Sequence, residues 1–348
     1  MDEDDKDELT EFDGSLPSPS GASTPRQVLQ WAVDLARYAP SLYNAQPWSW
    51  RVGTDNAELF MDVTRSFPVT DPDRREMRIS CGAALHHLEV ALAAAGWRWE
   101  LERSPDLEGT GLLARVRLTE RGDVDRQSLQ WVGAITRRHT DRRPFSTRAV
   151  DSDAQAALQS CVEADGVHLQ IVTQSEHHVW LAVLASKASE QQVAQEGYAA
   201  ELASVRCESE PSANIHADAV PHVVSPRHSD VPLRDFELSD LGTLPIPESV
   251  DEHPVWCILW TDRDTRLEWL SAGEALSRLL LTATDRGLAA GVQSQPVEVP
   301  WVRAMINRHL LSNLGHAQVV VRVGWAHSDD SELPASPRRP IDDVTSRS

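Results

Sequence analysis

The order of the predicted elements over residues 24–118 restricts the possible folds of this chain more than any other feature. The order is helix, two strands, helix, two strands, and the first helix opens with the capping box Thr24-Pro25-Arg26-Gln27. Strands that follow one another through short turns form antiparallel sheets, whereas a parallel sheet needs strands and helices in alternation. The helices are predicted at 25–38 and 71–96, and the strands at 48–52, 57–63, 97–101 and 112–118.

The remainder of the chain repeats this mixture of helices and strands. It contains neither G-x-G-x-x-G nor G-x-x-x-x-G-K-[ST], which argues against a Rossmann domain or a P-loop. The sequence therefore predicts an α+β fold of two halves, each with an antiparallel, mixed sheet packed by helices. Helices are predicted at 126–135, 152–164, 175–206, 265–286 and 301–311, and strands at 167–172, 255–260 and 317–325.

Changes in composition indicate where the halves and the tails begin. The first 23 residues are acidic and rich in serine, proline and glycine, which predicts a disordered tail. A proline-rich stretch without periodic pattern interrupts the later part of the chain, and such a stretch in a compact protein is often a lid. We expect an acidic tail at 1–23, a first half at 24–130, a second half at 131–330 with a lid-like insertion at about 207–250, and a C-terminal tail at 331–348.

The charge and the cysteine pattern exclude several classes of partner and compartment. With 33 Lys and Arg against 53 Asp and Glu, the chain carries a formal charge of −20, which repels nucleic acid. No apolar run approaches the roughly 18 residues of a membrane span, and no secretion signal is visible. The 4 cysteines lie far apart without a C-x-x-C pair, which favours a reducing cytoplasm over a disulfide framework.

Two arginine-rich segments are candidate anion sites. The segment RRHTDRRPF at 137–145 concentrates guanidinium donors around a histidine and a threonine, a combination suited to a phosphate. Arg338-Arg339 lies in the otherwise acidic C-terminal tail. Each segment, taken alone, is equally compatible with a solvated surface stretch or a linker.

The loop PSLYNAQPW at 40–48 is the candidate site for recognition of a heteroaromatic ring. Its asparagine and glutamine present donors and acceptors together, and its two prolines stiffen the backbone. The same residues also suit a plain turn between a helix and a hairpin.

Together these segments resemble the nitroreductase superfamily, and within it the Acg family, in which two nitroreductase-like halves are fused in one chain. The loop APSLYNAQPW lies in the first half and RRHTDRRPF in the second, so each half holds one of the two signatures. The segment SCGAALHHLEVALAAAGW, the stretch at 269–300 and the ending RRPIDDV add to the resemblance, which covers about 24–344.

The resemblance implies that the chain binds FMN at a pocket that combines the arginine segment of one half with the Ser/Asn loop of the other. One complete pocket and one FMN per chain are then expected, with the mirror-image site vestigial and the fused chain a monomer. The implied cofactor residues are Arg138, Thr140 and Arg338 at the phosphate with Arg339 beside them, His139 near the ribityl chain, Arg142 towards the pyrimidine, Pro40, Ser41, Asn44 and Gln46 along the ring, and the backbone N–H of Glu298 at flavin N5.

Three functions remain open at this stage. The first is an FMN-dependent oxidoreductase that uses NAD(P)H to reduce a nitro compound, quinone or other small aromatic acceptor, with chemistry borne by the flavin rather than by a catalytic side chain. The second is an FMN-storage protein closed by its lid, and the third is a flavin-free scaffold. No metal site is expected, because the acidic and histidine residues of the insertion match no zinc spacing: His216, Asp218, His222, His228 and Asp230.

Overall fold

Two sheets with the same strand order form the framework of this computed structural model. The first sheet contains the order β3-β4-β2-β1 and the second the order β7-β8-β6-β5, and all these neighbours pair antiparallel. Each of the first four strands thus has a counterpart in the second sheet, which confirms the predicted α+β fold of two related halves. The strands are β1 (Trp48–Val52), β2 (Asn56–Met61), β3 (Trp97–Arg103), β4 (Leu112–Arg121), β5 (Val167–Val172), β6 (Val255–Thr261), β7 (Ala289–Gln293), β8 (His316–Gly324) and β9 (Thr345–Arg347).

The structure describes most of the chain outside the N-terminal tail and the insertion. The expected disordered tail at 1–23 and much of the expected lid lie outside the described residues. The described residues are 24–104, 111–164, 166–205, 212–216, 219–220, 230–236, 244, 253–327 and 333–347.

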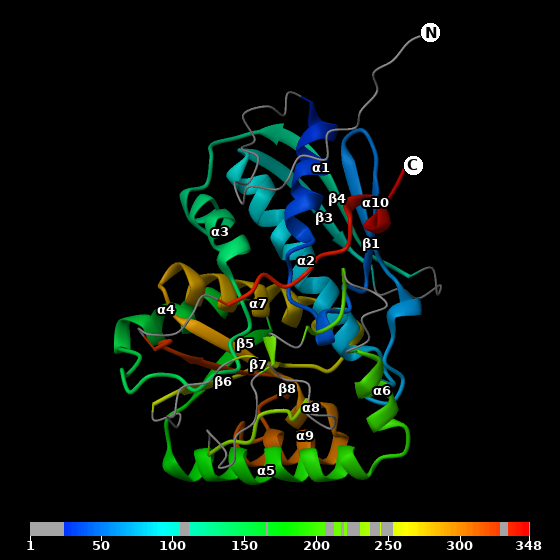
Figure 1. Cartoon of the computed structure of the whole chain (residues 1–348). Helices are drawn as coiled ribbons and strands as arrows, with labels where there is room; N and C mark the ends of the chain where they lie inside the picture. The colour runs from blue at the N-terminus through cyan, green and yellow to red at the C-terminus, as the bar shows by residue number, and fades with distance from the viewer. Residues whose placement is uncertain are drawn as a thin grey trace.

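Helices lie between the two sheets and over the outer face of the second sheet (Figure 1). The predicted capping box is confirmed at α1, where the Thr24 side chain accepts from the Gln27 N–H. None of the helices in the described part of the chain is long and apolar enough to cross a membrane. The helices are α1 (Pro25–Ala36), η2 (Leu42–Asn44), η3 (Val63–Arg65), α2 (Arg75–Ala94), α3 (Arg126–Arg137), α4 (Ser152–Val162), α5 (Ser175–Ala194), α6 (Tyr198–Ser204), α7 (Arg266–Asp285), α8 (Gln295–Glu298), α9 (Pro300–His309) and α10 (Ile341–Val344).

Helices α2 and α7 are counterparts, and they cross where each has a glycine. The sequence S-x-G-x-A-L occurs once in each, at 80–85 and 271–276. A Cβ atom on Gly82 would lie 2.0 Å from the Leu270 carbonyl oxygen, and one on Gly273 would lie 1.9 Å from that of Ile79. Only glycine allows backbones to approach this closely. The contact holds the two halves at a fixed distance.

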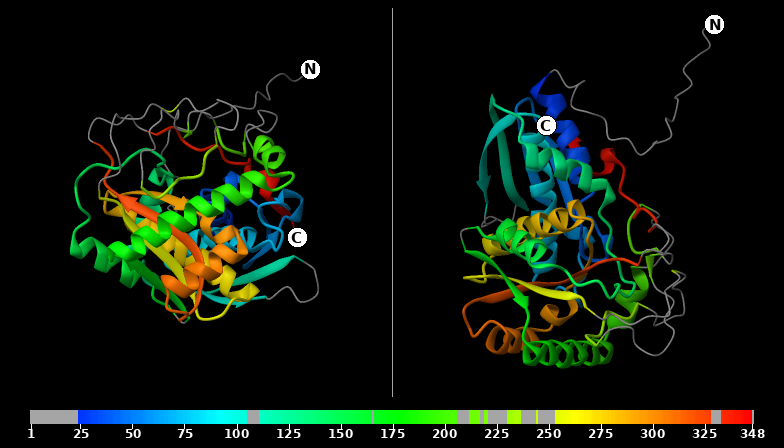
Figure 2. Two further views of the ribbon diagram at one scale, coloured as in Figure 1. Left: turned by 90° about the horizontal axis from the view of Figure 1, so that it is seen from below. Right: turned by 90° about the vertical axis from the view of Figure 1, so that its left-hand side faces the viewer.

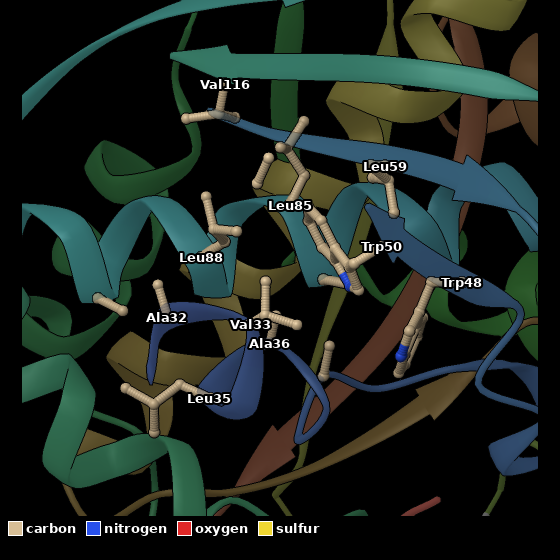
Figure 3. Close-up of a cluster of buried hydrophobic side chains, with 14 of the residues drawn as sticks. Ala32, Val33, Leu35, Ala36, Trp48, Trp50, Leu59, Leu85, Leu88 and Val116 are labelled. Carbon is tan, nitrogen blue, oxygen red and sulfur yellow. The ribbon is translucent and has the colours of Figure 1, made fainter. Parts of the chain in front are cut away.

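The largest apolar core lies between α1, α2 and the first sheet. Trp48 and Trp50 of β1 are fully buried and face the leucines of α2, as Figure 3 shows for Leu85. Full burial of one such large side chain contributes about 1.5–3 kcal/mol. A second core joins α4 and α7 to the second sheet, and a third joins that sheet to α5 and α9. Figure 2 shows α5 on the outer side of the second sheet.

Three features differ from the sequence-based expectations. A strand, β7, forms within the stretch after Gly287 for which no element was predicted. The helix predicted at 175–206 is two helices, because Gly197 adopts a φ of +86° between α5 and α6. The C-terminal tail is not a plain extension, since it forms α10 and then β9, which pairs parallel with β1 of the first sheet.

Candidate functional site

A cavity of about 330 Å³ lies between the two halves. This volume falls in the range of roughly 300–1,000 Å³ that is usual for small-molecule sites. The first half contributes the loop at 40–44 and the start of α2, and the second contributes β7, β8 and the residue that follows β7. The segment 138–142, the described part of the insertion and the C-terminal tail complete the wall. Of the predicted site residues, seven line the cavity: Pro40, Ser41, Asn44, Arg138, Thr140, Arg142 and Arg338.

The loop at 40–47 is held in a conformation that its own residues disfavour. Tyr43, Asn44 and Gln46 all have positive φ, at 51°, 56° and 51°. Side-chain hydroxyls support the loop, since Ser41 Oγ accepts from the Gln46 N–H at 3.0 Å and Ser80 Oγ accepts from the Leu42 N–H at 3.2 Å. A positive φ costs about 1–3 kcal/mol at a non-glycine residue that tolerates this conformation poorly, and such residues cluster at functional sites.

Two arginines, Arg138 buried and Arg338 half-buried, line the cavity, and neither has a carboxylate partner among the described residues. Arg138 ends α3 and is 6% exposed, and among the described residues its Nε and Nη1 atoms have no hydrogen-bond partner. The Nε atom of Arg338 is in the same situation. Burial lowers the pKa of Arg138 to about 10, and burial together with Arg138 lowers that of Arg338 to about 9. Buried unpaired cations are costly, so this end of the cavity is suited to an anion.

The segment after Arg138 runs along the edge of the second sheet. Thr140 forms a parallel bridge with Ala290 of β7. The backbone N–H of Asp141 donates to the Ala290 carbonyl at 2.9 Å. Arg142 donates Nη1 to the carbonyl of Ala219 in the insertion at 3.1 Å, and its guanidinium lies 5.1 Å from the centre of the Phe236 ring. Burial lowers the pKa of Arg142 to about 10.

The amide of Asn44 lines the cavity but already has protein partners at both ends. Its Nδ2 donates to the carbonyls of Asn214 and Pro337, each at 3.1 Å, and its Oδ1 accepts from Arg338 Nη1 at 2.7 Å. The side chain therefore joins the insertion and the C-terminal tail to the loop. Hydrogen bonding to a ring edge, as expected from the sequence, requires one of these bonds to be exchanged.

Gln46, Arg339 and His139 lie outside the lining of the cavity. Gln46 is fully buried, donates Nε2 to the Ser212 carbonyl at 2.9 Å and accepts from the Arg339 N–H at 2.8 Å. Arg339 in turn donates to the Gln46 carbonyl at 3.2 Å. This pair fastens the tail behind the loop, and the predicted contact of both residues with the ligand stays a prediction. His139 is half-buried beside the two lining residues that flank it.

Glu298 also lies outside the lining. Its backbone N–H, which was expected at flavin N5, donates to the Ser294 carbonyl at 3.1 Å within α8. No role was predicted for its side chain, yet the carboxylate is fully buried and accepts two hydrogen bonds from Arg234 of the insertion, at 2.5 and 2.6 Å.

Arg234 is a site residue that the sequence did not reveal. It donates to the hydroxyls of Tyr43 and Tyr198, at 2.5 and 2.9 Å, and pairs with Glu298. A fourth apolar cluster surrounds this network and includes Val220 and Phe236 of the insertion. The described parts of the insertion are thus packed against the loop and α6. An arginine in a proline-rich stretch carries no signal of such partners.

Glu76 is a second residue that the sequence did not reveal. It is 4% exposed, lies in the first turn of α2 and lines the cavity. Burial is the main cause that raises its pKa to about 8, with Arg75 opposing and Glu298 and Asp71 adding to the rise. A carboxyl group of this kind retains a proton near neutral pH.

The matching position on the other side of the α2–α7 contact holds an ion pair. Gly96 follows α2, and Gly287 follows its counterpart α7. Arg103 and Ser294 lie the same number of residues after these two glycines, and Ser294 lines the cavity. Arg103 donates to both carboxylate oxygens of Glu274 at 2.9 and 2.7 Å.

The residues considered for a metal do not form a described site. Asp218, His222 and His228 lie outside the described residues, whereas His216 and Asp230 are described. Over the described ranges no group of three or more His, Cys, Asp or Glu side chains is placed to hold a metal ion.

Comparison with known proteins gives relatives along nearly the whole chain. A putative NAD(P)H nitroreductase of Mycobacterium tuberculosis is 33% identical over 333 residues, which cover 95% of each chain. The putative NAD(P)H nitroreductase acg of the same species is 34% identical over 322 residues, or 91% of this chain and 95% of that protein. No family model matches the chain.

Solved structures show weaker likeness. A putative nitroreductase from Anabaena variabilis aligns over 86% of this chain and 88% of its own with a TM-score of 0.48 and 9% identity. A nitroreductase with bound FMN from Desulfitobacterium hafniense aligns over 62% of this chain and 95% of its own with a TM-score of 0.37 and 11% identity.

Proposed function

This chain belongs to the Acg family of putative NAD(P)H nitroreductases, and from that premise we propose that it binds one FMN between its halves and acts as an NAD(P)H oxidoreductase. Relatives that carry this activity in their names span nearly its whole length. The proposed acceptors are quinones, nitro compounds or other small aromatic molecules.

The pair formed by Arg138 and Arg338 is the observation that carries the proposal. Arg138 and Arg338 have guanidinium nitrogens that lack partners among the described residues, and the Thr140 hydroxyl lies on the same wall. A phosphate monoester offers charge and several acceptor oxygens, which complete these unpaired donors. The residues present therefore fit the phosphate end of FMN.

The remaining wall suits a planar ring. Pro40, Ser41 and Leu42 of the first half line it, as do Val292 and Gln293 of the second half. FMN, when bound, supplies the transfer of hydride between NAD(P)H and the acceptor. Arg142 contributes a positive charge to the cavity, and a cation beside the ring stabilises its reduced, anionic form.

FMN storage is the second candidate, and the contacts of the insertion favour it. The buried pair of Arg234 and Glu298 fastens the insertion to α8 beside the cavity. Breaking a buried ion pair costs about 3–5 kcal/mol, so opening along this route is slow if the pair must separate. A storage protein keeps its flavin but reacts poorly with NAD(P)H.

One experiment separates these functions. Purified protein is titrated with FMN, and the loaded protein is mixed with NADH or NADPH while flavin absorbance is followed by stopped flow. The proposal expects one FMN per chain and rapid bleaching by a nicotinamide. Bleaching by dithionite alone supports storage, and failure to take up FMN contradicts both functions.

Two further points belong to the same proposal. The fused halves suggest a monomer, which light scattering of the loaded protein tests directly. The cysteine pattern suggests a cytoplasmic location, which cell fractionation tests.

A further inference from the structure

Glu76 is the buried acid on the wall of the cavity. Glu76, Ile79 and Ser80 all line it, because residues three and four apart share one face of a helix. Asp235 is the other acidic residue among the described lining, and it is exposed to solvent. Glu76 is therefore the described acid that can hold a proton away from water at this site.

The neighbouring arginine does not depend on a charged Glu76. Arg75 donates Nη1 to the carbonyl oxygen of Gln318 at 2.7 Å and to its Oε1 at 3.1 Å. It donates Nη2 to the Val297 carbonyl at 3.0 Å as well as to the Glu76 carboxylate. These carbonyl partners remain when Glu76 is protonated, so the proton can come and go without leaving a buried guanidinium unpaired.

The other charged groups around Glu76 are occupied elsewhere. Glu298 of α8 pairs with Arg234. Arg303 of α9 pairs with Asp264 through Nη2 and Oδ1 at 2.6 Å.

Asp71, just before α2, points its carboxylate at the helix N-terminus. It accepts from the backbone N–H groups of Glu76 and Met77, at 3.2 and 3.0 Å. The negative charges of Asp71 and Glu298 oppose ionisation of Glu76, and the positive charges of Arg75 and Arg303 favour it. Burial is the largest effect, and it raises the pKa of the carboxyl group.

We propose that Glu76 is the proton donor of this cavity and delivers a proton to an oxygen of the acceptor while the acceptor is reduced. The proposal rests on the oxidoreductase function proposed above. A quinone that receives a hydride from the reduced flavin gains two electrons and one proton. The O–H bond of the Glu76 carboxyl then breaks and an O–H bond forms at the remaining quinone oxygen. The carboxylate recovers its proton from solvent.

Glu89 supplies a matched control on the same helix. Its side chain is half-buried, and burial together with the charge of Glu274 raises its pKa to about 8, as for Glu76. It does not line the cavity. Glu76→Gln and Glu89→Gln therefore remove similar carboxyl groups from different places.

The first measurement needs neither flavin nor activity. Infrared absorption of protonated carboxyl groups is recorded from about pH 6 to pH 10, a window chosen around the raised pKa values. We expect each variant to lose part of the absorption that titrates near pH 8 in the unmodified protein. An unchanged titration in Glu76→Gln overturns the proposal.

The second measurement uses protein loaded with FMN and reduced before mixing. Benzoquinone requires protons, whereas ferricyanide takes one electron and none. In the unmodified protein the benzoquinone rate should fall as pH rises through about 8, since only protonated Glu76 donates. Glu76→Gln should slow benzoquinone at least ~10-fold at neutral pH and lose that pH dependence. Glu89→Gln should keep the benzoquinone rate and its pH dependence. Ferricyanide should react equally with all three proteins.

Two outcomes contradict a role as proton donor. Equal slowing of both acceptors indicates a structural defect, and an unchanged pH profile for benzoquinone indicates another proton source. Glu76→Asp, which retains a carboxyl group, should recover part of the pH dependence. Failure of the unmodified protein to bind FMN is a failure of the proposed function, and the infrared titration still decides whether Glu76 holds a proton.

Discussion

The two sides of the α2–α7 contact have the same backbone plan but opposite charge arrangements. On one side Ser294 lines a cavity, and two arginines line it that have no carboxylate partner in the described part of the chain. On the other side Arg103 matches Ser294, and Glu274 neutralises it in a bidentate pair. The comparison teaches that a repeated fold sets the location of two possible sites, while the pairing of arginines decides which one is left to accept an anion.

The crossing glycines belong equally to both sides and should give the largest effect on stability. Gly82→Ala and Gly273→Ala each push a methyl group into a backbone carbonyl, so each should lower the free energy of unfolding by about 3 kcal/mol. Urea denaturation measures the loss. Gly133→Ala in α3, where nothing lies within 4 Å, is the control and should be neutral or slightly stabilising. Unequal effects at the first two positions would mean that the halves are not equivalent at the crossing.

Arg138→Met removes one of the two unpaired arginines on the cavity side. Loss of a charge-assisted phosphate contact should weaken FMN binding by ~10- to 100-fold. The flavin-free protein should become more stable, because a buried charge without a partner is replaced by an apolar side chain. Flavin fluorescence titration and thermal unfolding give the two values. Arg137→Met, at the exposed neighbouring residue, should change neither the FMN affinity nor the thermal stability. An equal loss of FMN affinity in both variants would contradict the assignment of Arg138 to the phosphate.

Arg103→Met is the same change at the matching position, and its expected signs are reversed. FMN affinity should stay as it is, and the protein should lose about 1–2 kcal/mol because Glu274 is left buried without its partner. The value is below that of a fully buried pair, since the Arg103 side chain is 37% exposed. Denaturation with and without FMN tests both statements. Weaker flavin binding here would show that the second side takes part in the site.

Glu89→Gln should give the smallest effect, visible in the pH dependence of stability. The raised pKa of Glu89 means that the folded protein holds a proton that the unfolded chain releases above about pH 4. Stability therefore falls as pH rises towards about 8, and the variant should lose part of this slope. We expect a difference of ~2–4 °C in midpoint between pH 5 and pH 9. Parallel midpoint curves would contradict it.

The order of elements was predictable because it depends on local pattern. The capping box at Thr24 and the alternating strand around Trp50 are confirmed as they were predicted. Strand β7 was missed because Ala289-Ala-Gly-Val-Gln contains a single β-branched residue, and its pairing with β8 overrides the weak propensity. Strand β9 has three residues and depends wholly on β1.

The site was predictable where a residue type alone suggests chemistry. Arg138, Thr140, Arg142 and Arg338 come together in one cavity with Ser41, although their ligand remains a proposal. Sequence could not show which polar groups are already used by the protein.

Two residues show why this limit exists. Glu298 faces Arg234 across 64 residues of chain, and the raised pKa of Glu76 depends in part on Glu298 of α8 and on Arg303 of α9. Their environments are created by tertiary packing, which no local pattern encodes.

The parallel pairing of β9 with β1 has a consequence for biosynthesis. Arg338 and the tail residues that wall the cavity are anchored by the last strand of the chain against one of the first. A nascent polypeptide can assemble both four-stranded antiparallel arrays on the ribosome and still lack part of its anion-binding wall until residues 338–347 have left the exit tunnel. Chains that stop before β9 should reach a folded state that retains little flavin.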